Sequence, residues 1–141
     1  MQMSISSFNH TLEKSNAWLK ELSDAGPFNS YEEAYTALRS VLHCLRDRLL
    51  VDQAVHLASE MPMLIRGMYY EGWKPAATPH KERTKEDFIE SVRNCLRNAT
   101  NRLEPEETTK AVLHFLNKKI SDGEISHVKA ELPQDILTLW Q

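Results

Sequence analysis

The strongest constraint on the fold is that the chain matches itself when residue 41 is placed on residue 112, a displacement that we call the long shift. It places residues 41–45 (VLHCL) on 112–116 (VLHFL) and residues 60–62 (EMP) on 131–133 (ELP), without a gap between the two matches. It also places His56 on His127. Any two amphipathic helices share a leucine spacing, but the helical period does not explain paired prolines, glutamates and histidines. The pattern indicates an internal duplication. Two copies are too few for an open repeat array, so we expect one closed core.

A second displacement, the short shift, is the alternative repeat. It places Arg39 and Leu42 on Arg93 and Leu96, and residues 48–49 (RL) on 102–103 (RL). The short shift matches one helix well but loses the proline motif. The long shift is therefore the preferred interpretation.

Apolar residues recur at steps of three and four along most of the chain, which is the period of an α-helix. The predicted fold is all-α, with residues 1–141 forming a single domain. We expect a compact bundle of six or more helices, built from two tandem copies of a three-helix unit. The first copy covers about 5–72, a connector about 73–84 and the second copy about 85–141. In the first helix, about 7–24, the residues expected to share the buried face are Leu12, Trp18, Leu19 and Leu22.

Capping residues mark several predicted helix boundaries. Ser30 with Glu33, and Ser121 with Glu124, have the spacing of a capping box. Thr84 can cap the helix that follows the connector. Proline at 62 should interrupt the third helix, and a new helical stretch should begin with this proline in its first turn.

Composition excludes several classes of function. Only four glycines occur, and none forms a phosphate-binding loop. The net charge of −3 gives no general reason to bind nucleic acid or an anionic membrane. Residues 1–14 contain no apolar run typical of a signal peptide, so we expect a cytoplasmic protein. Cys44 and Cys95 are expected to be thiols, and a disulfide between them is the alternative.

The leading candidate binding surface follows Pro62 in the chain and consists of Arg66, Tyr69, Tyr70 and Trp73. Arginine, tyrosine and tryptophan are enriched at the centres of protein interfaces. The spacing of four residues would place them in two adjacent rows on a continued helix. The alternative is structural, in which the aromatic side chains pin the connector onto the core.

The repeated histidines are weaker candidates. His43 matches His114, and His56 matches His127, so four imidazoles could hold a metal ion. All four are expected on the side of their helices away from the apolar stripe, and none belongs to a metal-binding motif such as H-E-x-x-H. The preferred interpretation is that they face solvent or an interface, with no metal and no cofactor.

Two segments resemble a known family. Residues 61–73 (MPMLIRGMYYEGW) are similar to the bacterial family called domain of unknown function 2267, and residues 123–133 (GEISHVKAELP) with the closing Leu139 and Trp140 support the likeness. The resemblance covers the chain from about Tyr31 onward. It implies a helical fold with a duplicated unit, and it implies no activity and no site residues.

The functional prediction follows from these candidates and from the lack of catalytic motifs. We expect a non-enzymatic protein-interaction module whose partner is another protein or a second copy of this chain. The alternative is a protein that binds a small ligand or a metal, through the repeated histidines or a cleft between the halves. An enzyme is the third hypothesis, because active sites can assemble from distant residues.

Overall fold

The computed structural model describes residues 5–141, and this part of the chain contains α-helices and short 3-10 helices but no strand. The first half contains α1 (Ser6–Ala25), α2 (Tyr31–Arg46), α3 (Val51–Ala58) and α4 (Met63–Tyr70). A connector with the 3-10 turn η1 (Pro75–Ala77) leads to the second half. The second half contains α5 (Lys85–Arg97), α6 (Pro105–Lys119), α7 (Asp122–Ala130), α8 (Gln134–Leu137) and η2 (Thr138–Trp140). The all-α prediction is confirmed.

Capping groups begin the helices where the sequence predicts. Ser30 Oγ accepts a hydrogen bond from the Glu33 backbone N–H at 3.1 Å, and Thr84 Oγ1 accepts one from Asp87 at 3.0 Å. Each bond satisfies a backbone donor that has no partner within the first turn. Pro62 is the N-cap residue directly before α4, so a helix restarts here as predicted, but the proline lies just outside its first turn, and α3 already ends at Ala58.

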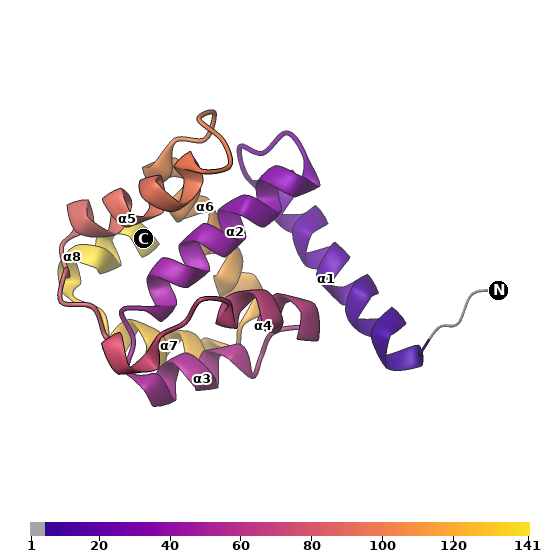
Figure 1. Cartoon of the computed structure of the whole chain (residues 1–141), viewed down its shortest axis with the longest axis horizontal. Helices are drawn as coiled ribbons and strands as arrows, with labels where there is room; N and C mark the ends of the chain where they lie inside the picture. Colours follow the sequence, from indigo (N-terminus) through magenta and orange to yellow (C-terminus); the bar gives the residue numbers. More distant parts are fainter. Residues whose placement is uncertain (1–4) are drawn as a thin grey trace.

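Helix α2 forms the centre of the molecule. It packs against α1, α4, α5 and α6 (Figure 1). Its apolar residues at steps of three and four, among them Leu38, Val41 and Leu42, are fully buried. Because α2 touches helices from both halves, one apolar core joins the whole described chain.

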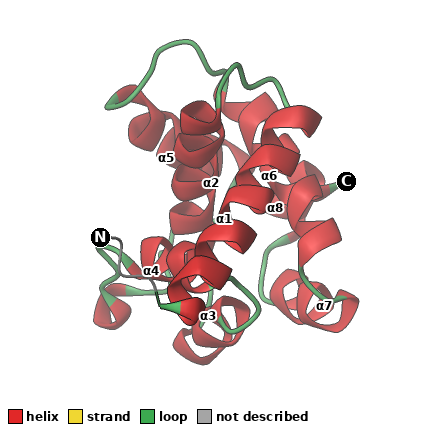
Figure 2. Ribbon diagram, turned by 90° about the vertical axis from the view of Figure 1, so that its right-hand side faces the viewer, coloured by secondary structure: helices red, strands yellow, loops and turns green. Residues whose placement is uncertain are grey.

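Helices α3 and α7 lie side by side at one end of the molecule, in the lower part of Figures 1 and 2. They are joined by polar side chains as well as by apolar packing. Gln53 of α3 donates a hydrogen bond to the Glu124 carboxylate of α7 at 2.8 Å. Glu124 is only 4% exposed, so this bond compensates part of the cost of burying its charge.

Helix α1 runs beyond the body of the molecule, and its N-terminal half extends to the right in Figure 1. Trp18 and Leu22, in its second half, are buried as predicted. The prediction for Leu12 is wrong, because this side chain is 50% exposed. The polar Thr11 and Ser15 face the body instead. None of the helices in residues 5–141 combines the length and the apolarity that crossing a bilayer requires.

Candidate functional site: the α1–α4 edge and its groove

Arg66 and Tyr69, from the predicted binding surface, make hydrogen bonds inside the fold. Arg66 donates from Nε to the carbonyl of Ala58 at 3.2 Å and from Nη2 to that of Met61 at 3.0 Å. These carbonyls lie at and just after the end of α3, where a cation is favourable. Tyr69 is fully buried, and its hydroxyl donates to the Ala54 carbonyl at 2.8 Å. Burial raises the pKa of Tyr69, which keeps the phenol protonated as a donor.

Tyr70 and Trp73 are half-buried and lie against each other. Their ring centroids are 5.5 Å apart with 31° between the ring planes. Both pack on the edge of the core. The four predicted residues therefore do not present one exposed surface. Tyr69 is a core residue, because the face of α4 that carries it turns toward α2 and α3.

His43 corrects the prediction that all four histidines face away from the core. It is 9% exposed, and its Nε2 lies 2.7 Å from the carbonyl of Met68 in α4. Burial lowers the pKa of His43, so the neutral ring donates Nε2–H to this carbonyl. The polar side of α2 is buried here because the C-terminal end of α4 packs on it.

Arg46 caps the same end of α4. Its Nη1 donates to the carbonyls of Tyr69 at 2.7 Å and Glu71 at 2.8 Å. Its Nε donates to the Asp47 carboxylate at 2.9 Å, and the residue is 3% exposed. The C-terminal carbonyls of α4 are therefore satisfied by cationic and imidazole groups from α2.

The other histidines divide between two places. His56 and His127 flank the buried Glu124, with Nδ1 at 3.3 Å and 4.0 Å from its Oε1. His114 lies elsewhere on the surface, with Nε2 at 2.7 Å from the Gln141 carbonyl. Within residues 5–141, no three histidine, cysteine or carboxylate side chains come together in a group able to hold a metal ion.

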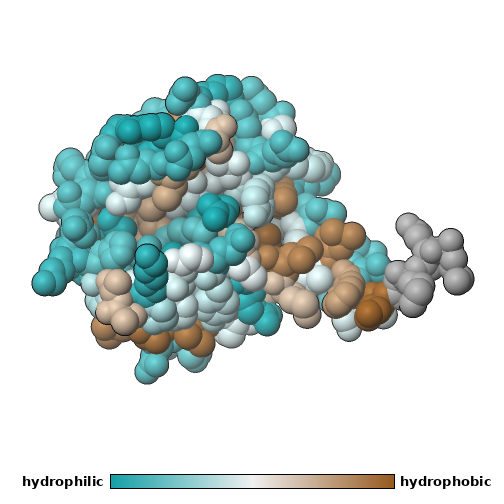
Figure 3. Space-filling model, in the orientation of Figure 1, coloured by the Kyte–Doolittle hydropathy of each residue, from teal (hydrophilic) through white to brown (hydrophobic). Residues whose placement is uncertain are grey.

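Apolar side chains gather on the surface where α1 leaves the body and meets α4 (Figure 3). We call this surface the α1–α4 edge, and its exposed members are Ile5, Phe8, Leu12, Met63 and Leu64, at 50–60% exposure. Ile5, Phe8 and Leu12 follow one another at steps of three and four, so they share one face of α1. A hydrogen bond from the Leu64 backbone N–H to Thr11 Oγ1, at 3.2 Å, holds the two helices together.

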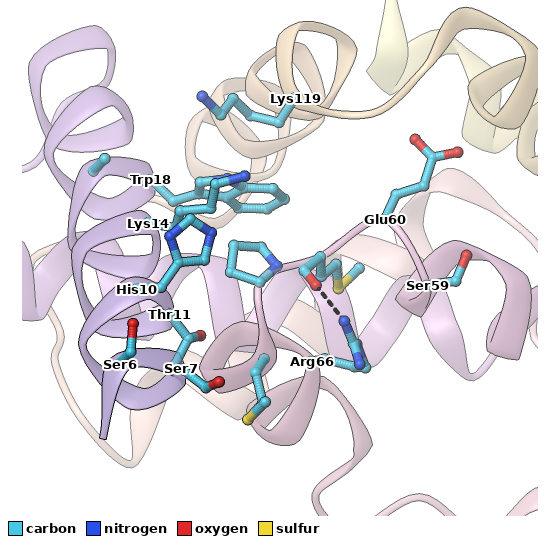
Figure 4. Close-up of a pocket in the computed structure, with 14 residues that line it drawn as sticks. Ser6, Ser7, His10, Thr11, Lys14, Trp18, Ser59, Glu60, Arg66 and Lys119 are labelled. Atoms are coloured by element: carbon cyan, nitrogen blue, oxygen red, sulfur yellow. Dashed lines mark hydrogen bonds between the residues drawn. The ribbon is translucent and has the colours of Figure 1, made fainter. Parts of the chain in front are cut away.

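A groove of about 910 Å³ runs along the other side of the N-terminal half of α1. Figure 4 shows His10, Lys14 and Trp18 of α1 on one side of it, with Glu60 and Arg66 opposite. Lys119 of α6 lines one end and also pairs with Glu21 at 3.0 Å. The groove is polar along much of its wall, and it is bordered by more cationic than anionic side chains.

Sequence reasoning missed the α1–α4 edge because it assigned the apolar residues of the first helix to a buried face. One signal for it is present: Ile5, Phe8 and Leu12 are apolar, yet Thr11, Ser15, Trp18 and Leu22 form a second stripe beside them. A helix with two adjacent stripes can bury only the one that faces the body, unless a further surface covers the other.

Comparison with known proteins adds a family and no activity. Residues 15–139 match the model of the family described as "Uncharacterized conserved protein (DUF2267)". No curated protein matches the chain. Because the matched stretch includes nearly the whole of the described fold, the chain belongs to the domain of unknown function 2267 family.

Proposed function

We propose that this chain is a non-enzymatic protein-interaction module that self-associates through the α1–α4 edge. The observation that carries the proposal is a group of large apolar side chains, half exposed or more, on the projecting N-terminal end of α1 and on the neighbouring start of α4 (Figure 3). Contiguous exposed apolar patches are typical of interaction sites. Arg66 and Tyr69 are not part of this interaction surface, because their side chains already make hydrogen bonds within the fold.

The size of the patch fits a weak dimer. A large apolar side chain has on the order of 150–200 Å² of surface. Five such chains, half exposed or slightly more, present about 500 Å², within the range of the largest patches on monomers. Two copies facing each other would bury about 1,000 Å², close to the lower limit for a specific interface. We therefore expect association at micromolar or higher concentrations.

The polar surroundings of the patch also favour a second copy as the occupant. Between residues 5 and 12, the polar residues of α1 are serine, asparagine, histidine and threonine, with no carboxylate, lysine or arginine. In a two-fold dimer the same surface meets itself, so a charged group close to the axis would face its own copy. A neutral rim avoids that repulsion.

The test is the oligomeric state of the full chain. Sedimentation velocity over a concentration series should show wild-type protein passing from monomer to dimer. A variant with Phe8→Ser and Leu12→Ser should stay monomeric. The matched control carries Leu50→Ser and Val55→Ser. Leu50 lies directly before α3 and Val55 lies within it, and both are about as exposed as Phe8 and Leu12. It should dimerise as wild type does.

Two results would overturn this proposal. One is a wild-type protein that stays monomeric at every concentration, and the other is a dimer lost only in the control variant. Circular dichroism of both variants shows whether they are folded. Because all four substituted side chains are exposed, we expect little change in stability.

A small-ligand site in the groove is the second candidate function. Its support is the volume of about 910 Å³ together with the cationic side chains of Lys14 and Lys119 on its border. This chemistry suits a small carboxylate or phosphate compound. The test is the shift in melting temperature with a panel of such anions, compared between wild type and Lys14→Gln. Equal shifts in the two proteins, or no shift in wild type, would remove the candidate.

We further propose that the two halves are copies of one unit, as the long shift suggests. Helix α3 begins at residue 51 and α7 at residue 122, a separation equal to the long shift from residue 41 to residue 112. Helix α4 begins at residue 63 and α8 at residue 134, which is the same separation. His43 and His114 each contact a carbonyl near the end of their own half. These features support the duplication. We also propose a cytoplasmic location, which the two free thiols support.

A further inference from the structure

Cys44 and Cys95 are far apart in the sequence but face each other in the fold. Cys44 lies on α2 and Cys95 on α5, and these helices pack against one another. Arg48, just beyond the end of α2, donates a hydrogen bond to Ser91 of α5 at 3.0 Å. Glu33 at the start of α2 pairs with Arg102 beyond the end of α5, so the two helices run antiparallel. Cys44 and Cys95 each lie about one helical turn from the Arg48–Ser91 contact, which places them on the facing sides of the two helices. Neither cysteine is in a disulfide. Cys44 is 4% exposed. Cys95 is half-buried at the edge of the core, so a small molecule in solvent can reach only one of the two sulfurs with ease.

The surroundings shift the pKa values of the two thiols in opposite directions. The hydrogen bond from Cys44 lowers the pKa of Cys95 to about 7, although burial opposes this. The charges of Arg39 and Arg46 lower it further, and Asp47 acts in the opposite direction. The same contact, together with burial, raises the pKa of Cys44. Near neutral pH, a large share of Cys95 is therefore thiolate, the reactive form, and Cys44 remains a thiol.

We propose that Cys95 and Cys44 are a redox-sensitive pair in which a hydroperoxide oxidises Cys95 and Cys44 then closes an intramolecular disulfide. This inference stands apart from self-association, since α2 and α5 carry none of the residues of the α1–α4 edge. The sequence gives no motif for it, because the two cysteines come from different halves and are not a C-x-x-C pair.

The chemistry has two balanced steps. In the first, the Cys95 thiolate attacks the outer oxygen of the hydroperoxide. The O–O bond breaks, Cys95 becomes a sulfenic acid, and the remaining alkoxide or hydroxide takes a proton from solvent. In the second, the Cys44 sulfur attacks the Cys95 sulfur and loses its proton. The S–O bond breaks, the S–S bond forms, and the leaving hydroxide takes up a proton as water. Two thiols lose two electrons, and the peroxide gains them.

The disulfide would join the two halves of the molecule covalently. It would link α2 to α5 and close the long loop of chain that runs from Cys44 to Cys95. A cross-link over a long loop restricts the unfolded chain and raises stability when the native geometry accepts it. Oxidation should therefore raise the melting temperature of the protein, and a dithiol reductant should reverse the rise.

The experiment treats reduced full-length protein with hydrogen peroxide and measures intact mass and non-reducing peptide maps. Wild type should lose two hydrogens and yield one peptide pair that joins Cys44 to Cys95. Cys44→Ala removes the group that lowers the pKa of Cys95, so Cys95 should oxidise more slowly than in wild type and should stop at the sulfenic acid, which dimedone traps. Cys95→Ser should remain unmodified at the same peroxide dose. Alanine at 44 suits this buried apolar site, and circular dichroism verifies the fold of both variants.

Three outcomes would overturn the proposal. The first is wild-type protein whose thiols both stay reduced at a peroxide dose that oxidises free glutathione. The second is oxidation that appears only as disulfide-linked dimers on a non-reducing gel. The third is dimedone labelling on Cys44 in the Cys95→Ser variant. Alkylation of wild type by iodoacetamide gives an independent reading, since Cys95 should react many times faster than Cys44.

Discussion

Replacing Arg46 with methionine should destabilise this protein far more than replacing Arg39, which lies on the same helix. Arg46 is almost fully buried and donates to the carbonyls of Tyr69 and Glu71 and to the Asp47 carboxylate. Methionine would fill most of the space but would leave these acceptors without a donor. Arg39 is 43% exposed and makes one long contact, 3.5 Å, with Glu71.

The magnitude follows from the bonds that are lost. A hydrogen bond from a charged donor contributes about 1.5–3 kcal/mol, and breaking a buried ionic group costs about 3–5 kcal/mol. We expect a loss of about 3–5 kcal/mol in unfolding free energy for Arg46→Met. An exposed pair contributes about 1 kcal/mol or less, so Arg39→Met should lose no more than that. In a chain of this size, the larger loss corresponds to a fall of roughly 10 °C in melting temperature.

Urea denaturation followed by circular dichroism measures both losses on the same scale. The comparison removes general effects of placing methionine on α2, because both variants carry one. If Arg46→Met and Arg39→Met lost the same free energy within about 1 kcal/mol, the capping of α4 by Arg46 would not be a main source of stability. A variant too unstable to purify would be measured as Arg46→Lys, which can retain one of the bonds and should lose less.

Two further predictions use matched pairs of residues. Thr108 and Thr109 of α6 are both fully buried, but only Thr109 has a hydrogen-bond partner for its hydroxyl within residues 5–141. Thr108→Val should therefore stabilise the fold by about 1 kcal/mol, and Thr109→Val should destabilise it by a similar amount. Losses of equal size for the two variants in urea denaturation would contradict this. Because burial lowers the pKa of His43 below its ordinary 6.5, the unfolded chain binds the proton more readily, and stability should fall as pH drops below that value. His43→Gln keeps a donor and cannot titrate, so its loss of stability between about pH 7 and about pH 5 should be smaller than that of wild type, whereas the exposed control His114→Gln should match wild type.

Much of the helical architecture could be predicted from the sequence because its determinants are local. Ser30 and Thr84 each cap a helix through a backbone group three residues away. Pro62 interrupts the helical pattern through its own ring geometry. The apolar period of α2 and α6 similarly indicates which face is buried, since a helix places residues three and four apart on one side. Such signals act within one or two turns and do not depend on the neighbouring helices.

The candidate sites could be predicted only in part because they depend on which helices meet. The sequence of α2 alone places His43 on the polar side, and the docking of α4 buries it there. The predicted interaction residues Arg66 and Tyr69 lie on a helix that was correctly expected, but tertiary packing directs their side chains to carbonyls of α3. Their composition could indicate an interface or a core anchor, and composition alone does not distinguish the two.

The sequence by itself determined the class of fold, several of the helix starts and the membership of the family, since each depends on local spacing or on a long match of residues. Only the tertiary structure decided what those helices present to solvent and to one another. It left the apolar face of α1 uncovered beyond the body, placed Glu124 between His56 and Gln53, and brought Cys44 and Cys95 together. The physical reason is that burial and contact are properties of pairs of surfaces, and a single helix carries the information for only one surface of each pair.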